Sequence, residues 1–208
     1  MMMNPHTNTA AINSIGVILA GGQSSRMGTD KAALRIRHES LLQRTRRILQ
    51  EAGCSRVLLS GHTRPDWSED TIPDLLPGAG PVGGIVSALT WAEENAMPDS
   101  CLLFAPVDAP LLSPTLLASM LSAAQHGDGC LIEKSPLPVV LRASEIVLKR
   151  CSEARIDLQS DRSWSVRRFV DPLVLKKLDV HESTCAQLIN VNTPSQWESL
   201  LRELENSA

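Results

Sequence analysis

Residues 15–34 constrain the fold and the chemistry of this chain more than any other stretch, and they read IGVILAGGQSSRMGTDKAAL. The first six residues are apolar and uncharged, which is typical of a central parallel strand buried on both faces. Gly21 and Gly22 follow directly, and the polar loop after them carries Arg26 and Lys31. Glycines let the backbone approach a ligand closely and present its N–H groups to an anion. A buried strand that leads into such a loop predicts a binding site for nucleotide phosphates.

The spacing excludes two common phosphate loops. A P-loop requires G-x-x-x-x-G-K-[ST], but here five residues separate Gly22 from Gly28, and Lys31 lies three residues beyond Gly28. The dinucleotide fingerprint G-x-G-x-x-G is absent. The remaining alternatives are a different class of nucleotide site and a glycine-rich turn with a surface arginine and lysine.

Predicted strands and helices alternate along the rest of the chain. This pattern predicts one three-layer α/β/α domain over residues 15–208, with a mostly parallel, doubly wound (Rossmann-like) sheet, after a disordered extension over residues 1–14. Residues 61–80 are polar and rich in Pro and Gly, so we expect a functional loop there. The chain is expected to close with a short strand, which would point Asn190 and Asn192 to the same face, and then a helix capped by Thr193.

Composition narrows the range of partners. The 208 residues have a formal net charge of −3, so there is no general basic field for nucleic acid. No apolar run approaches the roughly 20 residues that cross a bilayer, so no membrane contact is expected. The five cysteines are scattered without a C-x-x-C motif, and the first residues do not resemble a secretory signal. These features favour a cytoplasmic protein with reduced thiols.

Asp108 is the candidate metal ligand. It lies just beyond the predicted strand CLLFA, at the sheet edge where open α/β sheets bind ligands, and a carboxylate suits Mg²⁺. Asp108 could alternatively cap the helix that starts near Ser113, but it lies five residues too early in the sequence for that role. The chain shows no nucleophilic Ser or Cys motif, but a phosphate monoester has a second pKa of about 6 and attacks without a base. Arg26, Lys31 and an Mg²⁺ on Asp108 would then supply positive charge to a triphosphate whose α-phosphorus is attacked.

Four motifs in this order resemble the molybdenum cofactor guanylyltransferase (MobA) family: LAGGQSSRMGTDK, GPVGGI, FAPVDAPLL and NVNTP. The resemblance implies an enzyme that uses GTP, Mg²⁺ and molybdenum-bound molybdopterin to make the guanine dinucleotide cofactor, with transient contacts to other molybdenum cofactor proteins. Ser60 stands where many members have an Asn that contacts the base or ribose. A carboxylate at Asp74 could accept hydrogen bonds from N1–H and the amine of guanine. The implied nucleotide-binding residues are Leu19, Ala20, Gly21, Gly22, Lys31, Ser60, Asp74 and Asp108, with Asn190 and Asn192 on the metal or acceptor side.

Two other functions remain open at this stage. One is a cytidylyltransferase of the same fold that acts on molybdopterin or on a sugar or polyol phosphate. The other is a non-catalytic nucleotide-binding partner that uses the fold only as a platform.

Overall fold

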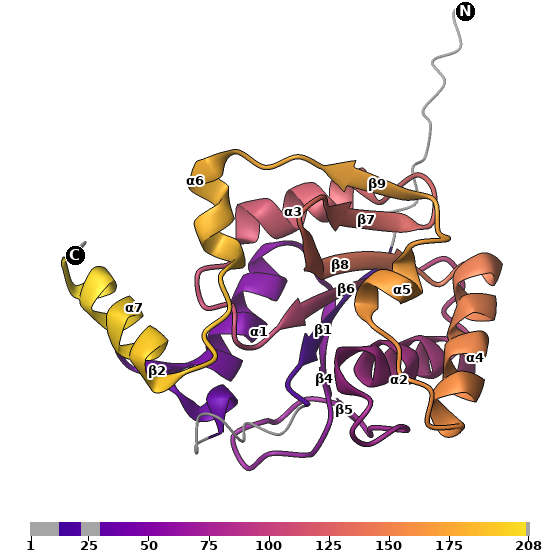
Figure 1. Ribbon diagram of the computed structural model, residues 1–208, viewed down its shortest axis with the longest axis horizontal. Helices are drawn as coiled ribbons and strands as arrows, with labels where there is room; N and C mark the ends of the chain where they lie inside the picture. Colours follow the sequence, from indigo (N-terminus) through magenta and orange to yellow (C-terminus); the bar gives the residue numbers. More distant parts are fainter. Residues whose placement is uncertain (1–12, 22–29, 207–208) are drawn as a thin grey trace, which may run out of the picture.

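The computed structural model describes residues 13–21 and 30–206 and consists of one large sheet with helices on both of its faces (Figure 1). Seven strands form the sheet in the order β5-β4-β1-β6-β8-β7-β9. Their bounds, in chain order, are β1 Ser14–Leu19, β4 Arg56–Ser60, β5 Thr71–Ile72, β6 Cys101–Pro106, β7 Gly129–Ile132, β8 Ser135–Arg142 and β9 Leu175–Leu178. Strand β8 is antiparallel to both of its neighbours, and every other pairing is parallel. The predicted α/β class with a mostly parallel sheet is therefore confirmed.

Within the described ranges, α-helices are interspersed with these strands along the chain. The α-helices are α1 Leu41–Glu51, α2 Gly80–Glu94, α3 Pro114–Ala123, α4 Glu145–Gln159, α5 Val166–Val170, α6 Glu182–Cys185 and α7 Pro194–Asn206. The short elements are the 3₁₀ turns Lys31–Ala33 and Ala186–Leu188 and the two-stranded ribbon of β2 Arg35–Ile36 with β3 Glu39–Ser40. None of the helices in the described ranges is long and apolar enough to span a bilayer.

The core consists of two apolar layers, because successive side chains of a strand point to opposite faces. On β1, Ile15, Val17 and Leu19 belong to the layer that also contains residues of α2, α4 and α5, whereas Ile18 belongs to the layer of α1 and α3. Gly16 lies where α1 approaches most closely, since a Cβ there would lie 3.1 Å from Leu49 Cβ. Burial on both faces explains why β1 carries no polar side chain in its interior.

Two local expectations are wrong. Residues 61–80 are not all loop, because β5 pairs with β4 at the edge of the sheet. Residues 189–193 form no strand, since a 3₁₀ turn ends at Leu188 and α7 begins at Pro194. The backbone N–H of Val191 instead donates to the carbonyl oxygen of Asp108 over 2.8 Å, which holds this irregular segment beside the end of β6.

Candidate functional site

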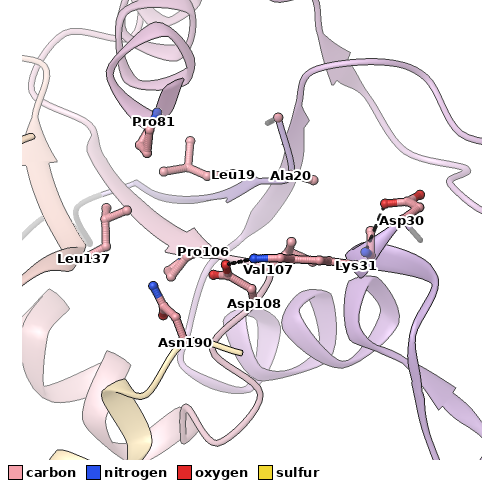
Figure 2. A pocket seen from close by; sticks show the side chains of 12 residues that line it. Leu19, Ala20, Asp30, Lys31, Pro81, Pro106, Val107, Asp108, Leu137 and Asn190 are labelled. Atoms are coloured by element: carbon pink, nitrogen blue, oxygen red, sulfur yellow. Dashed lines mark hydrogen bonds and ion pairs between the residues drawn. The ribbon is translucent and has the colours of Figure 1, made fainter. Parts of the chain in front are cut away.

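Two neighbouring pockets lie at the carboxyl ends of β4, β1 and β6, and they share Ala20 and Gly21 as a common wall. We name them after one residue each. The Lys31 pocket, of about 210 Å³, is lined by Leu19, Ala20, Gly21, Asp30, Lys31, Ala32, Pro81, Pro106, Val107, Asp108, Leu137 and Asn190 (Figure 2). The Asp74 pocket, of about 700 Å³, is lined by Ala20, Gly21, Gly61, His62, Arg64, Asp74, Pro77, Gly78 and Gly80. Ligands of open α/β sheets bind at this edge.

Lys31 and Asp108 meet in the Lys31 pocket. The Lys31 ammonium donates to Asp108 Oδ2 over 2.8 Å, and the two side chains are 17% and 18% exposed (Figure 2). The same ammonium donates to Asn192 Oδ1 over 2.7 Å. Strands β1 and β6 are parallel neighbours, with Leu19 opposite Pro106, so the segments after them start at one edge of the sheet. This pairing explains how residues 77 positions apart share a pocket.

Asp30, which directly precedes Lys31, fixes the position of Lys31. Its Oδ1 accepts from the backbone N–H of Ala32 over 3.1 Å and so caps the 3₁₀ turn that begins at Lys31. Its other oxygen accepts from the guanidinium of Arg64. Arg26 and Gly22, both predicted to bind the nucleotide, lie outside the described residues.

Asp74 is positioned by a tight turn before α2. Its Oδ1 accepts from the backbone N–H of Leu76 over 3.0 Å. Ser87 of α2 supports the same turn, because its hydroxyl accepts from the N–H of Leu75 over 3.0 Å. The other residues that line the Asp74 pocket are mostly glycine and proline, together with Ala20, His62 and Arg64.

The remaining predicted residues are placed unequally. Asn190 lines the Lys31 pocket, and Asn192 contacts Lys31, although neither residue belongs to a strand. Ser60 is 3% exposed and is absent from the lining of both pockets. Its hydroxyl lies beneath α2, where a Cβ on Gly84 would be 2.8 Å from Ser60 Oγ. Ser60 is thus the sheet partner of Leu19, a lining residue of the Lys31 pocket, but does not itself line either pocket.

Arg64 and His62 line the Asp74 pocket but were not predicted from the sequence. Both follow β4 within residues 61–80, for which the sequence predicts a functional loop without singling out these two residues. Their one sequence signal is position, because ligands bind just beyond the carboxyl ends of parallel strands. Asp30, the partner of Arg64, lies 34 positions away, so no local sequence pattern predicts this ion pair.

The site has few groups for a metal ion. No cluster of three or more His, Cys, Asp or Glu side chains suited to a metal occurs in the described part of the chain. Magnesium in nucleotide enzymes commonly takes only one or two carboxylates together with substrate phosphates and water. The Asp108 carboxylate and the nearby amide oxygens of Asn190 and Asn192 therefore fit an ion that arrives with a nucleotide.

A mostly parallel α/β sheet with a lysine–aspartate pair at its carboxyl edge suits the binding of a nucleotide. Comparison with known proteins shows that the chain is a nucleotidyltransferase. The family model described as MobA-like NTP transferase domain matches residues 16–172. The chain therefore belongs to the family of MobA-like NTP transferases.

Relatives agree with this assignment. The chain is 38% identical over 189 residues to the molybdenum cofactor guanylyltransferase of Xanthomonas euvesicatoria pv. vesicatoria (strain 85-10), covering 90% of this chain and 94% of the relative. Its fold is similar to that of molybdopterin-guanine dinucleotide biosynthesis protein A from Archaeoglobus fulgidus, with a TM-score of 0.71, 15% identity and coverage of 94% and 100%. A Mycobacterium tuberculosis H37Rv protein solved in complex with manganese has a TM-score of 0.58, 16% identity and coverage of 91% and 98%.

Proposed function

We propose that this nucleotidyltransferase transfers GMP from GTP to the phosphate of molybdopterin and releases pyrophosphate. The observation that carries the proposal is the Lys31–Asp108 pair in a pocket that shares a wall with the pocket of Asp74. The relative from Xanthomonas euvesicatoria, named a molybdenum cofactor guanylyltransferase, supports the choice of reaction.

The nucleotide would extend across both pockets, with guanine beside Asp74 and phosphates beside Lys31. The Asp74 carboxylate can accept from both N1–H and the exocyclic amine of guanine, whereas cytosine offers no such pair of donors. The backbone of Ala20 and Gly21, shared by both pockets, would follow the ribose and the first phosphate. Gly22 and Arg26, which follow Gly21 in the sequence, also belong to this proposal.

In the reaction, an oxygen of the acceptor phosphate attacks the α-phosphorus while the bond to the pyrophosphate oxygen breaks. No protein base is needed, because the acceptor phosphate is largely ionised near neutral pH. The Lys31 ammonium would neutralise charge on the phosphates through its third N–H, or by exchanging Asp108 or Asn192 for a phosphate oxygen. Asp108, with the amide oxygens of Asn190 or Asn192, would hold an Mg²⁺ that supplies further positive charge to the phosphates.

The test is formation of the dinucleotide product. Purified protein is incubated with Mg²⁺, molybdopterin and either GTP or CTP, and the product is identified by mass spectrometry while pyrophosphate release is followed. We expect the guanine product, and a loss of rate of at least about 10²-fold in Asp108→Asn. Asp99→Asn is the matched control, because Asp99 precedes the first residue of β6 and so lies at the end of this strand away from Asp108. Its positive φ of 58° also suits Asn as well as Asp.

Two results would contradict the proposal in different ways. A product from CTP with none from GTP would refute the guanine assignment and favour the cytidylyltransferase alternative. No product from either nucleotide would refute molybdopterin as the acceptor. A cytoplasmic location and transient contacts with other molybdenum cofactor proteins remain predictions from the sequence.

A further inference from the structure

Arg64 lies at the border between the two pockets. It lines the Asp74 pocket, and only 20% of its side chain is exposed. Its guanidinium donates to the carboxylate of Asp30, which lines the Lys31 pocket and directly precedes Lys31. Arg64 therefore contacts both pockets, since it lines one of them and pairs with a residue that lines the other.

Lys31 and Arg64 are the two permanently charged cations among the described residues that line these pockets. A triphosphate carries several negative charges, and such cations balance part of them beside a bound metal ion. The Lys31 ammonium is already shared by a carboxylate and an amide oxygen, whereas within the described ranges the Arg64 guanidinium has the single partner Asp30. That carboxylate is 47% exposed, so solvent weakens the ion pair.

We propose that Arg64 is a further nucleotide-binding residue, released by Asp30 to bind the phosphate chain where it passes from the Asp74 pocket to the Lys31 pocket. A guanidinium donates two parallel hydrogen bonds to phosphate oxygens, and this arrangement is stronger than an exposed carboxylate pair. The proposal rests on the proposed function to the extent that one nucleotide occupies both pockets.

The alternative is that Arg64 and Asp30 form a purely structural ion pair, which holds the segment after β4 against the segment that begins at Asp30. The two roles predict opposite effects of Asp30→Asn. Asparagine keeps an oxygen for the N–H of Ala32 but loses the charge that holds Arg64. If Arg64 binds the phosphates, this substitution frees the guanidinium and strengthens triphosphate binding. If the ion pair is purely structural, the substitution weakens triphosphate binding, as Arg64→Ala does.

The experiment is calorimetric titration of the full chain with GTP, GMP and inorganic tripolyphosphate in the presence of Mg²⁺. For Arg64→Ala we expect GTP and tripolyphosphate to bind about 10- to 100-fold more weakly and GMP to be affected far less. Arg64→Lys should lie between wild type and Arg64→Ala, because a lysine keeps the charge without the fork. Asp30→Asn should tighten GTP binding about two- to fivefold, and this gain should vanish when Arg64→Ala is also present.

Arg56→Ala is the matched control. Arg56 is also paired with a surface aspartate, Asp70, but it is absent from the lining of both pockets, so its loss should leave all three affinities unchanged. The proposal is overturned if Arg64→Ala weakens GTP and GMP equally, or if Asp30→Asn weakens GTP. If the wild type binds tripolyphosphate and CTP but not GTP, the guanine assignment fails, and the role of Arg64 is judged by CTP against CMP. If no triphosphate of any kind binds, both proposals fail.

Discussion

The side chain of Gln196 is expected to support catalysis although it lines neither pocket. Its Oε1 accepts from the backbone N–H groups of Asn192 over 2.8 Å and Thr193 over 3.1 Å, while Thr193 Oγ1 accepts from the N–H of Gln196 over 3.3 Å. These bonds form a capping box at the start of α7. Because Asn192 Oδ1 accepts from the Lys31 ammonium over 2.7 Å, the box also fixes a partner of the proposed catalytic cation.

Gln196→Leu keeps the size of the side chain and removes its acceptor oxygen. Both backbone N–H groups belong to exposed or half-buried residues and can bind water instead, so the cost is that of a lost helix cap, about 0.5–2 kcal/mol. For a chain of 208 residues, each kcal/mol lowers Tm by roughly 2–4 °C. If the ordering of Asn192 bears this free energy, kcat/KM falls about two- to thirtyfold.

The assay compares initial rates of pyrophosphate release with thermal unfolding for wild type, Gln196→Leu and Gln196→Glu. Glutamate keeps the acceptor and adds a negative charge at a helix N-terminus, so it should restore both Tm and kcat/KM. Gln43→Leu is the matched control, because Gln43 forms the same kind of capping box with Ser40 at the start of α1. It should lower Tm by a similar amount and leave kcat/KM unchanged.

The reasoning is refuted if Gln196→Leu lowers Tm while kcat/KM stays at the wild-type value. In that case α7 would contribute stability alone. It is also refuted if Gln196→Glu recovers Tm without recovering kcat/KM, because the acceptor oxygen is the only feature that the proposed coupling requires.

Three further predictions concern stability and specificity. Gly129→Ala should destabilise the fold by at least about 3 kcal/mol in urea unfolding, because the residue has a φ of +146° and a Cβ would lie 2.0 Å from the carbonyl oxygen of Val140; a loss below about 1 kcal/mol would contradict this. Asp74→Asn should lower the preference for GTP over CTP in initial rates, and an unchanged ratio would remove the argument for guanine recognition. Burial raises the pKa of the Cys54 thiol from 9.0 to about 12. Only the unfolded thiol ionises between these values, so stability falls as pH rises from about 9 toward 12, and Cys54→Ala should lessen the loss between pH 8 and pH 10; equal losses in both proteins would exclude Cys54 as a cause.

The sequence was sufficient to predict the main parts of the sheet. The apolar run of β1 predicts a strand buried on both faces. A charged residue soon after such a strand, as at Lys31 and Asp108, predicts a position at the ligand-binding edge of the sheet. Their meeting within 2.8 Å follows once β1 and β6 are parallel neighbours.

Other features depend on contacts between distant segments and could not be predicted in this way. The motif NVNTP singled out Asn192, but this residue does not lie on a strand. The hydrogen bond from Val191 to Asp108 and the one from Lys31 to Asn192 hold it in place. Ser60 ends the predicted strand, but the absence of a side chain at Gly84 lets α2 cover it. Arg64 was missed because its partner Asp30 lies 34 positions away.

The reversed direction of β8 has a consequence for how this architecture can diversify. Because β8 runs against β6, the wall of the Lys31 pocket at Leu137 belongs to the beginning of a strand and directly follows the tight connection from β7. The Asp74 wall, in contrast, lies before α2 on the far side of β1. Lengthening or shortening the β7–β8 connection would therefore reshape the Lys31 pocket at Leu137 and leave the Asp74 pocket unchanged, so the two pockets can diversify independently.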